Sequence, residues 1–417
     1  MRFIIVTIGT EGDVRPYIAL ARELKSNNHE VSIATSENHF NLINNFAIEC
    51  IPIKFKGCAK RPTSLFGFRF VRSIKSSIVN EEGYLSALWS VCQKADAIIY
   101  NVATFPCLYI AEKLGIPSFG AFMQPHHPTK DFPDPSVTNG KPLGGVFNLA
   151  GFWLFDFLHW VYVRKSINKW RKETLKLPEI PLSDTILKQM KQRKCRILYA
   201  YSPSLVPKPA EWRSDRLQVT GYWYLDTLKD YSPSPELDFF LNSGPPPVFI
   251  STMWNVDKFS KEKITKIGDL SNVRLIIHDL HGEMEEMHST EWIFYIKGPI
   301  PHEWLFKRVA AAVHHGGLGI SMNCIRAGVP MITIPADTDG NDHRFWAYQL
   351  SKSNVGVYID ADNGNGQFIS RLSLAIKTAI SSNDIKQHSL ALSKKISAET
   401  GLQNAIRFIT NEVAGLT

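Results

Sequence analysis

Residues 310–330 read AAAVHHGGLGISMNCIRAGVP, which is the pattern of a strand, a glycine turn and a helix. The apolar run Ala310–His314 predicts a buried strand, and Ile320–Ala327 has helical spacing before Gly328. Glycines at a strand-to-helix turn let backbone amides approach a phosphate, and a helix N-terminus favours an anion. The alternative is a plain turn with one buried histidine. The residues of the predicted anion site are His315, Gly316, Gly317, Leu318 and Gly319.

The rest of the chain repeats this rhythm of short apolar runs and helix-length amphipathic segments. Several runs are continuously apolar, as strands covered by helices on both faces must be. The sequence therefore predicts an α/β fold with two doubly wound, Rossmann-like parallel-sheet domains that face a central cleft. The expected strands are Arg2–Gly9, Glu30–Thr35, Ile48–Ile53, Ala97–Asn101, Ser118–Phe122, Arg196–Tyr201, Val248–Ser251, Val273–His278, Ile293–Ile296, Ala310–His314, Met331–Ile334 and Gly356–Ile359.

A proline-rich stretch, residues 201–247, separates the two halves and indicates an irregular connection. We place the boundary near residue 240, so that residues 1–240 form the N-terminal domain with its linker. A length of 417 residues is enough for two domains of ordinary size.

Composition excludes several classes of protein. The net charge of +8 is spread along the chain, without the basic stripe expected of a nucleic-acid-binding protein. The six cysteines form no C-x-x-C pair, and no metal site is visible, so we expect no bound metal or cofactor. The aromatic-apolar stretch 151–163 is too short to span a bilayer, and the first residues lack a signal-peptide cleavage site. We therefore expect a cytoplasmic protein, either free in solution or peripheral at a membrane.

The loop Thr7–Pro16, TIGTEGDVRP, follows the first expected strand directly. Its glycines allow a tight turn, and Pro16 suits the first turn of a helix. Asp13 is thus expected at or beside a helix N-terminus, facing the cleft. Its carboxylate is either a helix cap or a general base that takes a proton from a bound hydroxyl group.

A third polar loop, Pro335–Trp346, follows the expected strand Met331–Ile334. Its aspartates, Asn341 and His343 are side chains that can bind several sugar hydroxyls. A solvated polar loop is the alternative for any single one of these residues.

These motifs resemble those of the sugar-nucleotide-dependent glycosyltransferases of the GT-B fold. Thr7–Pro16 is similar to the family's opening G-(S/T)-x-G-D-V-x-P, and Trp304–Gly319 with Arg326–Pro330 is similar to its donor-binding signature. The segment Pro203–Pro209, with Val219–Trp223, resembles the sterol 3-beta-glucosyltransferases. Bacterial glycosyltransferases of antibiotic aglycones are also similar, and the resemblance covers nearly the whole chain.

The resemblance implies an inverting, metal-independent transfer of a hexose from a UDP- or dTDP-sugar to an acceptor hydroxyl. Asp13 would deprotonate the acceptor, and His315 with the amides after it would hold the diphosphate. Gly298–Phe306 would line the base pocket, and Asp342 and His343 would contact the donor sugar. The resemblance also implies a donor domain over 241–397 and a last helix over 398–417 that returns to the N-terminal domain.

The sequence departs from the family pattern around the donor. The serine-containing loop reads Ser251–Trp254, with Ser251 as its expected donor contact, and position 320 is Ile instead of Thr or Ser. His278–Gly282 replaces a Trp-Gly segment, and Ala336–Arg344 is about three residues longer than the family's loop. These changes indicate either an unusual sugar nucleotide or weakened donor binding.

The acceptor is expected in the N-terminal domain. Phe122–Pro135 supplies Phe122, Gln124, His126 and His127, while Phe147–Tyr162 is dense in Phe, Trp and Leu. The second segment is either the apolar wall of a pocket for a sterol, polyketide or other lipophilic alcohol, or a core helix, or a helix that rests on a membrane surface.

Two other functions stay open at this point. One is a non-catalytic lipophile-binding protein of the same fold with a degraded donor site, which would bind a ligand without releasing a nucleotide. The other is a sugar-nucleotide epimerase of the same fold, which would act on the donor without any acceptor.

Overall fold

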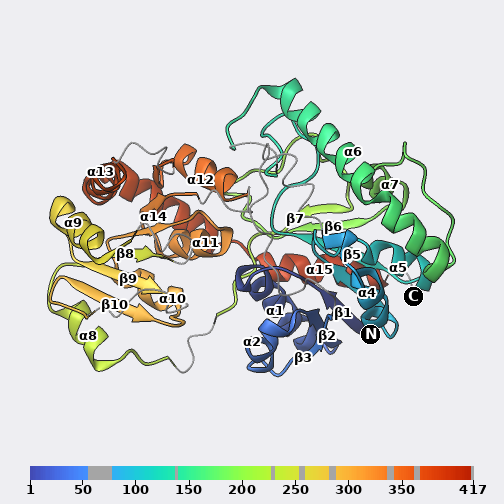
Figure 1. The fold of residues 1–417 in the computed structure, drawn as a ribbon, viewed down its shortest axis with the longest axis horizontal. Coiled ribbons are helices and arrows are strands. Elements are labelled where there is room, and N and C mark those ends of the chain that lie inside the picture. Colours follow the sequence, from blue (N-terminus) through green and yellow to red (C-terminus); the bar gives the residue numbers. More distant parts are fainter. Residues whose placement is uncertain are drawn as a thin grey trace. The chain divides into compact units, whose positions relative to one another are not determined.

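The computed structural model of the 417-residue chain describes residues 1–54, 78–136, 140–226, 231–252, 259–280, 288–335, 342–360 and 367–414. The chain forms two compact units (Figure 1). The first contains Met1–Leu225 together with Glu399–Thr417, and the second contains Asp226–Ala398. The boundary expected near residue 240 lies instead at Leu225, because α8 (Pro235–Asn242) belongs to the second unit.

The first unit is built on a seven-stranded parallel sheet with the order β3-β2-β1-β4-β5-β6-β7. Its middle strand β4 is buried along its whole length, and β1 is buried after Arg2, because helices cover both faces. The strands are β1 (Arg2–Val6), β2 (Glu30–Thr35), β3 (Glu49–Pro52), β4 (Ala97–Tyr100), β5 (Ser118–Phe122), β6 (Arg196–Tyr199) and β7 (Leu217–Val219).

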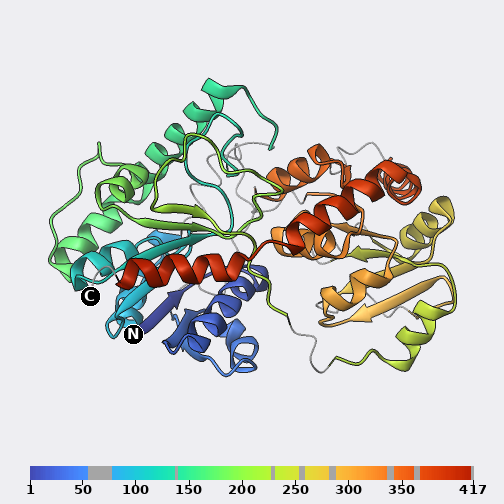
Figure 2. The same cartoon turned by 180° about the vertical axis from the view of Figure 1, so that it is seen from behind.

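The helices of this unit vary in length from one turn to seven. They are α1 (Glu11–Ser26), α2 (Phe40–Asn44), α4 (Tyr84–Cys92), α5 (Cys107–Leu114), α6 (Gly145–Trp170), α7 (Ile186–Gln192) and α15 (Gly401–Ala414). The last of these completes the unit from the far end of the chain: α15 packs against α1, as Figure 2 shows from behind.

A close approach of two glycines allows α15 to dock. A Cβ atom at Gly401 would lie 2.6 Å from the carbonyl oxygen of Tyr222 and 2.8 Å from the carbonyl carbon of Gly221. Next to this contact, the Ser202 hydroxyl donates a hydrogen bond of 2.6 Å to Glu399, just before the helix. The C-terminal segment therefore belongs to the first unit by packing and by hydrogen bonding.

The second unit contains a six-stranded parallel sheet with the order β10-β9-β8-β11-β12-β13. Val248 and Ile250 of β8 face a core with α9 and α13, while Phe249 between them packs on Phe306 from the other face. The strands are β8 (Val248–Ser251), β9 (Leu275–Asp279), β10 (Ile293–Lys297), β11 (Ala311–His314), β12 (Met331–Thr333) and β13 (Gly356–Tyr358). The remaining helices are α9 (Lys261–Ser271), α10 (His302–Leu305), α11 (Leu318–Ala327), α12 (Asp342–Lys352), α13 (Phe368–Ser381) and α14 (Asn383–Ser397).

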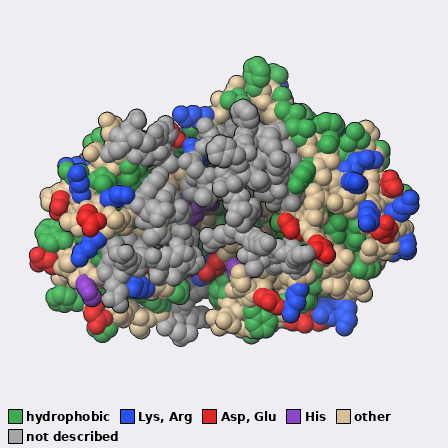
Figure 3. Space-filling view, viewed as in Figure 1, with side chains coloured by type: hydrophobic (Ala, Val, Ile, Leu, Met, Phe, Trp, Pro, Cys, Tyr) green, Lys and Arg blue, Asp and Glu red, His purple; other side chains and the backbone are tan. Residues whose placement is uncertain are grey.

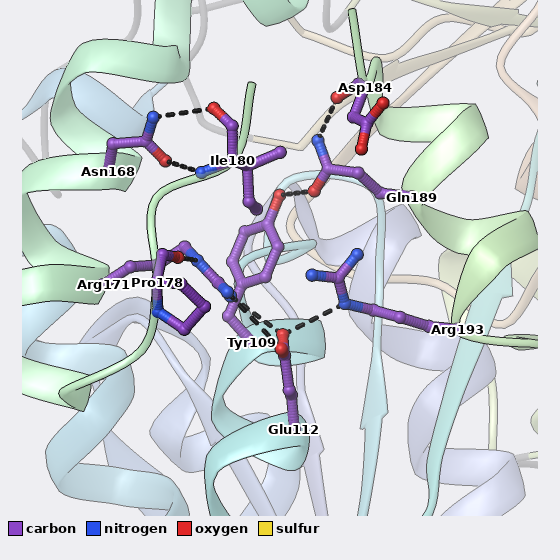
Figure 4. A network of polar contacts seen from close by, with 9 residues as sticks. All are labelled: Tyr109, Glu112, Asn168, Arg171, Pro178, Ile180, Asp184, Gln189 and Arg193. Atoms are coloured by element: carbon purple, nitrogen blue, oxygen red, sulfur yellow. Dashed lines mark hydrogen bonds and ion pairs between the residues drawn. The ribbon is translucent and has the colours of Figure 1, made fainter. Parts of the chain in front are cut away.

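Polar contacts fix the C-terminal end of α6 to α5 and to the segment around Pro178 and Ile180 (Figure 4). Arg171, which is 1% exposed, pairs with Glu112 of α5 at 2.8 Å and lies over the ring of Tyr109. Asn168 accepts a hydrogen bond from the backbone N–H of Ile180 and donates one to its carbonyl, both at 2.9 Å. Because a buried guanidinium is costly unless it is paired, this network holds α6 in one place.

The expected fold class is confirmed: both sheets are parallel, doubly wound and Rossmann-like in strand order. Each expected strand is present and agrees within two residues at its ends, except that β1 ends at Val6, three residues before the expected Gly9. The strand β7 was not expected, because its three residues lie inside the proline-rich stretch.

Candidate functional site

The loop between β1 and α1 holds Asp13 at the third position of the helix. Thr10 donates hydrogen bonds from its backbone N–H and its hydroxyl to Asp13 Oδ2, at 2.7 and 2.9 Å. A Cβ atom at Gly9 would lie 2.5 Å from the same oxygen, so glycine is required there. Asp13 is therefore the N3 partner of a capping box whose N-cap is Thr10, and the same carboxylate remains the predicted general base.

The loop after β4 supports this segment from the neighbouring strand. The Asn101 side-chain amide donates to the Thr7 hydroxyl at 3.1 Å and to the Ile8 carbonyl at 2.9 Å. Thr104, which is fully buried, donates to the Val6 carbonyl at 2.7 Å. Because β1 and β4 are adjacent although they are not consecutive, their carboxyl ends form the crevice in which open α/β sheets bind ligands.

A cavity of about 400 Å³ lies at this edge of the first unit. Asp13 and Asn101 are part of its wall, and most of the other lining side chains are apolar or aromatic. The lining residues are Ile8, Gly9, Asp13, Tyr17, Ile78, Asn101, Val102, Ala103, Phe105, Phe122, Met123, Gln124, His126, Ser136, Phe155 and His159. An apolar cavity with a few polar groups and a carboxylate is suited to a lipophilic molecule that carries a hydroxyl group.

The structure brings three of the four predicted acceptor residues to this cavity: Phe122, Gln124 and His126. His127 is not part of its wall. Its Nδ1 lies 2.6 Å from the hydroxyl of Tyr199, and its ring packs against Trp212. Burial lowers the pKa of His127 to about 4, with a smaller contribution from His126, so the ring is neutral near pH 7. His127 therefore holds the loop after β5 in place through Tyr199 and Trp212, outside the cavity.

His159 of α6 is a cavity residue that the sequence analysis did not select. Its ring packs edge-on against Phe105, at 5.9 Å between ring centres, and burial lowers its pKa to about 4. Phe155 lines the cavity from one turn earlier on the same helix. The aromatic segment Phe147–Tyr162 thus does contribute a wall, as one of its interpretations predicts, but through its inward side chains only.

In the second unit, β11 ends at His314 and the glycine loop leads into α11, with Gly317 as the N-cap. Gly316 has a φ of +87°, and a Cβ there would lie 2.8 Å from the carbonyl oxygen of His343. The Gly316 N–H donates to His314 Nδ1 at 3.1 Å, which fixes the turn. The amides of Leu318, Gly319 and Ile320 form the first turn of α11, where backbone N–H groups have no partner within the helix. This arrangement is suited to an anion.

His315 lies beside this helix N-terminus. Its ring is 4.6 Å from the ring of His343 at the start of α12, in an edge-on arrangement. A Cβ at Gly317 would lie 2.5 Å from His315 Nε2, so Gly317 leaves the space that this ring occupies. Burial, followed by His343, lowers the pKa of His315 well below its usual range. His315 is thus a neutral hydrogen-bonding group near pH 7.

The other residues predicted to contact the sugar donor lie at the ends of β8 and α12. Ser251 ends β8 and is 3% exposed, and Asp342 begins α12 directly before His343. Within the described residues, no three His, Cys, Asp or Glu side chains are placed to hold a metal ion. Met253, Trp254 and the predicted polar residues from Ala336 to Asn341 lie outside the described residues.

One departure from the family pattern has a clear structural role. His278, on β9, is 5% exposed, and its Nε2 lies 2.8 Å from the carbonyl oxygen of Gly298. It therefore connects β9 to the start of the segment Gly298–Phe306, the predicted base pocket. In that segment His302 stacks on Phe306, at 4.7 Å between ring centres and 11° between ring planes.

Residues 3–133 match the model of the glycosyltransferase family 28 N-terminal domain. A sterol 3-beta-glucosyltransferase of Yarrowia lipolytica is 31% identical over 99% of this chain, and one of Pichia angusta is 32% identical over 99%. The alignments cover only 29% and 33% of those two proteins, so the chain spans about a third of the length of the curated relatives it matches.

Solved structures of similar fold cover almost the whole chain. The glycotransferase of kitacinnamycin superposes with a TM-score of 0.71 at 15% identity, covering 98% of both chains. The Streptomyces sp. SF2575 glycosyltransferase SsfS6, complexed with thymidine diphosphate, superposes with a TM-score of 0.65 at 15% identity, covering 99% of both. At this level of identity the likeness establishes the fold alone.

Proposed function

We propose that this chain, a GT-B protein with a glycosyltransferase family 28 N-terminal domain, is a sugar-nucleotide-dependent glycosyltransferase. Its acceptor is a lipophilic small molecule with a hydroxyl group, and a sterol is the first candidate because the matched relatives act on sterols. The observation that carries the proposal is the Asp13 carboxylate in the wall of a largely apolar cavity.

In the proposed reaction Asp13 takes the proton of the acceptor hydroxyl. The acceptor oxygen then forms a bond to the anomeric carbon of the sugar, while the bond from that carbon to the diphosphate oxygen breaks. The electron pair of the broken bond stays on the leaving nucleotide diphosphate. Attack from the face opposite the leaving group inverts the configuration of the anomeric carbon, so we propose an inverting enzyme.

We assign the diphosphate to the glycine loop of the second unit. The first-turn amides of α11 and the neutral ring of His315 are donors for the phosphate oxygens, and they stabilise the charge that develops there. Because backbone and imidazole donors can supply this stabilisation, we propose a reaction without a metal ion. We propose that the donor is a UDP- or dTDP-hexose. Ser251, Asp342 and His343 are its further contacts.

The variant Asp13→Asn tests the role of the carboxylate. The amide oxygen of asparagine can still accept the hydrogen bonds of Thr10, so the melting temperature should stay near that of the wild type. Loss of a general base should lower kcat about 10²–10⁴-fold, with little change in nucleotide affinity. Steady-state kinetics of sugar transfer and calorimetric titration with the nucleotide measure the two effects.

The control variant is Thr10→Ala, which removes the cap and keeps the carboxylate. It should lower the free energy of unfolding by about 1 kcal/mol and change kcat less than tenfold. If Asp13→Asn turned over at the wild-type rate, Asp13 would be a helix cap only.

A lipophile-binding protein without transferase activity is the second candidate function. The cavity lies entirely within the first unit and needs no donor, and Ile320 lacks the hydroxyl that the family places beside the phosphate. This candidate requires sterol binding without any nucleotide release. Acceptor-dependent release of the nucleotide would exclude it.

A further inference from the structure

The long helix α6 carries its large apolar side chains on the outside. Six of them form what we call the α6 apolar face, and Phe147 is 69% and Trp153 53% exposed. Apolar side chains gather over α6 along the upper edge of the molecule in Figure 3. The members of the face are Val146, Phe147, Trp153, Leu154, Phe157 and Val161.

The opposite side of α6 is buried and includes polar groups. Asn148 donates to the Lys130 carbonyl at 2.8 Å, and Asp156 accepts from the backbone N–H of Leu187 at 3.2 Å. Asn168 accepts a hydrogen bond from the backbone N–H of Ile180 and donates one to the Ile180 carbonyl. A helix on the surface of a soluble domain normally places its polar side chains outward. This helix instead has solvent-facing apolar groups along residues 146–161, which corresponds to roughly 23 Å of helix.

Lysines continue the same side of the helix beyond the apolar face. Phe157, Val161, Lys165 and Lys169 are spaced by four residues, so they follow one another along one side. Lys172 and Lys176 are also exposed just after the helix, and Lys141 is exposed just before it. Acidic side chains are also exposed near the helix: Glu173 and Glu179 follow it, the second 3.7 Å from Lys172, and Glu81 and Glu82 follow the segment Ile78–Asn80 that packs on α6. At the C-terminal end of the apolar face Lys165, Lys169, Lys172 and Lys176 outnumber Glu173 and Glu179, so that end is positively charged.

We propose that the α6 apolar face docks on the surface of a lipid bilayer that contains anionic phospholipids. Aromatic and aliphatic side chains on one side of a helix, with lysines beside them, are the pattern of a helix that lies in the interface plane. The aromatic and aliphatic groups enter the boundary between headgroups and acyl chains, and the lysines contact the anionic headgroups. The charge distribution makes a bilayer a better match than an uncharged protein groove.

The helix lies on the membrane and does not cross it. By length and composition Gly145–Leu175 is apolar enough to span a bilayer. However, its inner side holds Asn148, Asp156 and Asn168 in hydrogen bonds to the rest of the first unit. Transfer of α6 into the hydrocarbon would break these bonds and remove one wall of the cavity.

If the protein is a glycosyltransferase, as proposed above, docking of α6 on a bilayer places the acceptor cavity next to the membrane. Phe155 and His159 line the cavity from the inner side of the same helix. A docked α6 therefore holds the cavity directly behind the lipid-facing surface, where a lipophilic acceptor is concentrated. Vesicle binding itself needs no transferase activity, so the two proposals can fail separately.

The test is flotation of the full chain with vesicles of phosphatidylcholine and phosphatidylserine, and with vesicles of phosphatidylcholine alone. We expect binding to the anionic vesicles that weakens as the salt concentration rises. The double variant Phe147→Ser/Trp153→Ser should bind at least about tenfold more weakly, since it removes two buried apolar groups from the bound state. The double charge reversal Lys165→Glu/Lys169→Glu should reduce the preference for anionic vesicles.

Phe239→Ser is the matched control, because Phe239 is a phenylalanine on α8 of the second unit and is 75% exposed. It should bind vesicles like the wild type. All variants change exposed side chains, so their melting temperatures should agree with the wild type. Absence of binding to either vesicle, or an equal loss in Phe239→Ser, would overturn the proposal. So would a dimer in vesicle-free solution that Phe147→Ser dissociates, which would make a second copy the occupant.

Discussion

His126 and His127 are adjacent in the sequence and serve different purposes. His126 lines the cavity with Asp13, whereas His127 binds the hydroxyl of Tyr199 through its ring. The backbone N–H groups of both histidines donate to that same hydroxyl, each at 3.0 Å. The Tyr199 hydroxyl thus orients the pair so that only one ring lines the cavity.

We predict that His126→Gln and His127→Gln have separable effects. His126→Gln should raise the KM for the acceptor several-fold with an unchanged melting temperature, because only the cavity wall changes. His127→Gln should lower the melting temperature and leave the KM nearly unchanged. The measurements are acceptor-dependent kinetics and thermal unfolding of both variants. An equal rise in KM for both would mean that both rings contact the acceptor.

The pH dependence of stability gives an independent check on His127. Its pKa is about 4 in the folded protein and 6.5 in its ordinary state, so unfolding takes up a proton between these two values. The wild type should therefore lose stability relative to His127→Gln as the pH falls from 6.5 towards 4, by up to about 1.4 kcal/mol for each pH unit. Chemical denaturation across this range measures the difference. Parallel curves for the two proteins would mean that His127 titrates like an exposed histidine.

At the scale of elements, the turn between β11 and α11 depends on its glycines. We predict that Gly316→Ala weakens nucleotide binding at least about tenfold, because its φ of +87° is unfavourable for alanine and the new Cβ would lie 2.8 Å from the His343 carbonyl. The shift of this loop would move His315 relative to His343. Calorimetric titration with UDP and dTDP measures the loss.

Gly151→Ala provides the comparison for that substitution. Gly151 lies inside α6 with nothing within 4 Å of the position of a Cβ, so alanine should stabilise the protein by about 0.5–1 kcal/mol and leave nucleotide affinity unchanged. If both variants bound the nucleotide like the wild type, the glycine loop would not be the diphosphate site.

The strands of both sheets were largely predictable from the sequence because they are buried on both faces. Continuous apolar runs such as Ala97–Tyr100 then mark strands without ambiguity. The choice among the three interpretations of the segment Phe147–Tyr162 was not predictable, because aromatic residues occur on both sides of α6. Phe155 and Trp160 face inward, whereas Trp153 and Phe157 are exposed, and only packing distinguishes them.

In the whole molecule the two sheets share the same order over six strands, to which the first unit adds β7, and each has a loop of predicted function at the point where the order reverses. This explains why the loops at Asp13 and His315 were recognisable: each directly follows a strand. Asn101 and Phe105 were missed because they join Asp13 only through the pairing of β1 with β4, and Val6 lies opposite Tyr100 in that register. The spacing of residues along the sequence does not indicate that β1 pairs with β4.

Sugar transfer to a lipophilic hydroxyl group can be measured directly in an assay with radiolabelled UDP-glucose and dTDP-glucose. The wild-type chain is incubated with a sterol such as cholesterol, and the organic phase is analysed for labelled glycoside. We predict a labelled product that requires the sterol and one of the two donors and that Asp13→Asn does not form. Sterol binding without labelled product or nucleotide release with either donor would contradict the account and favour the lipophile-binding alternative.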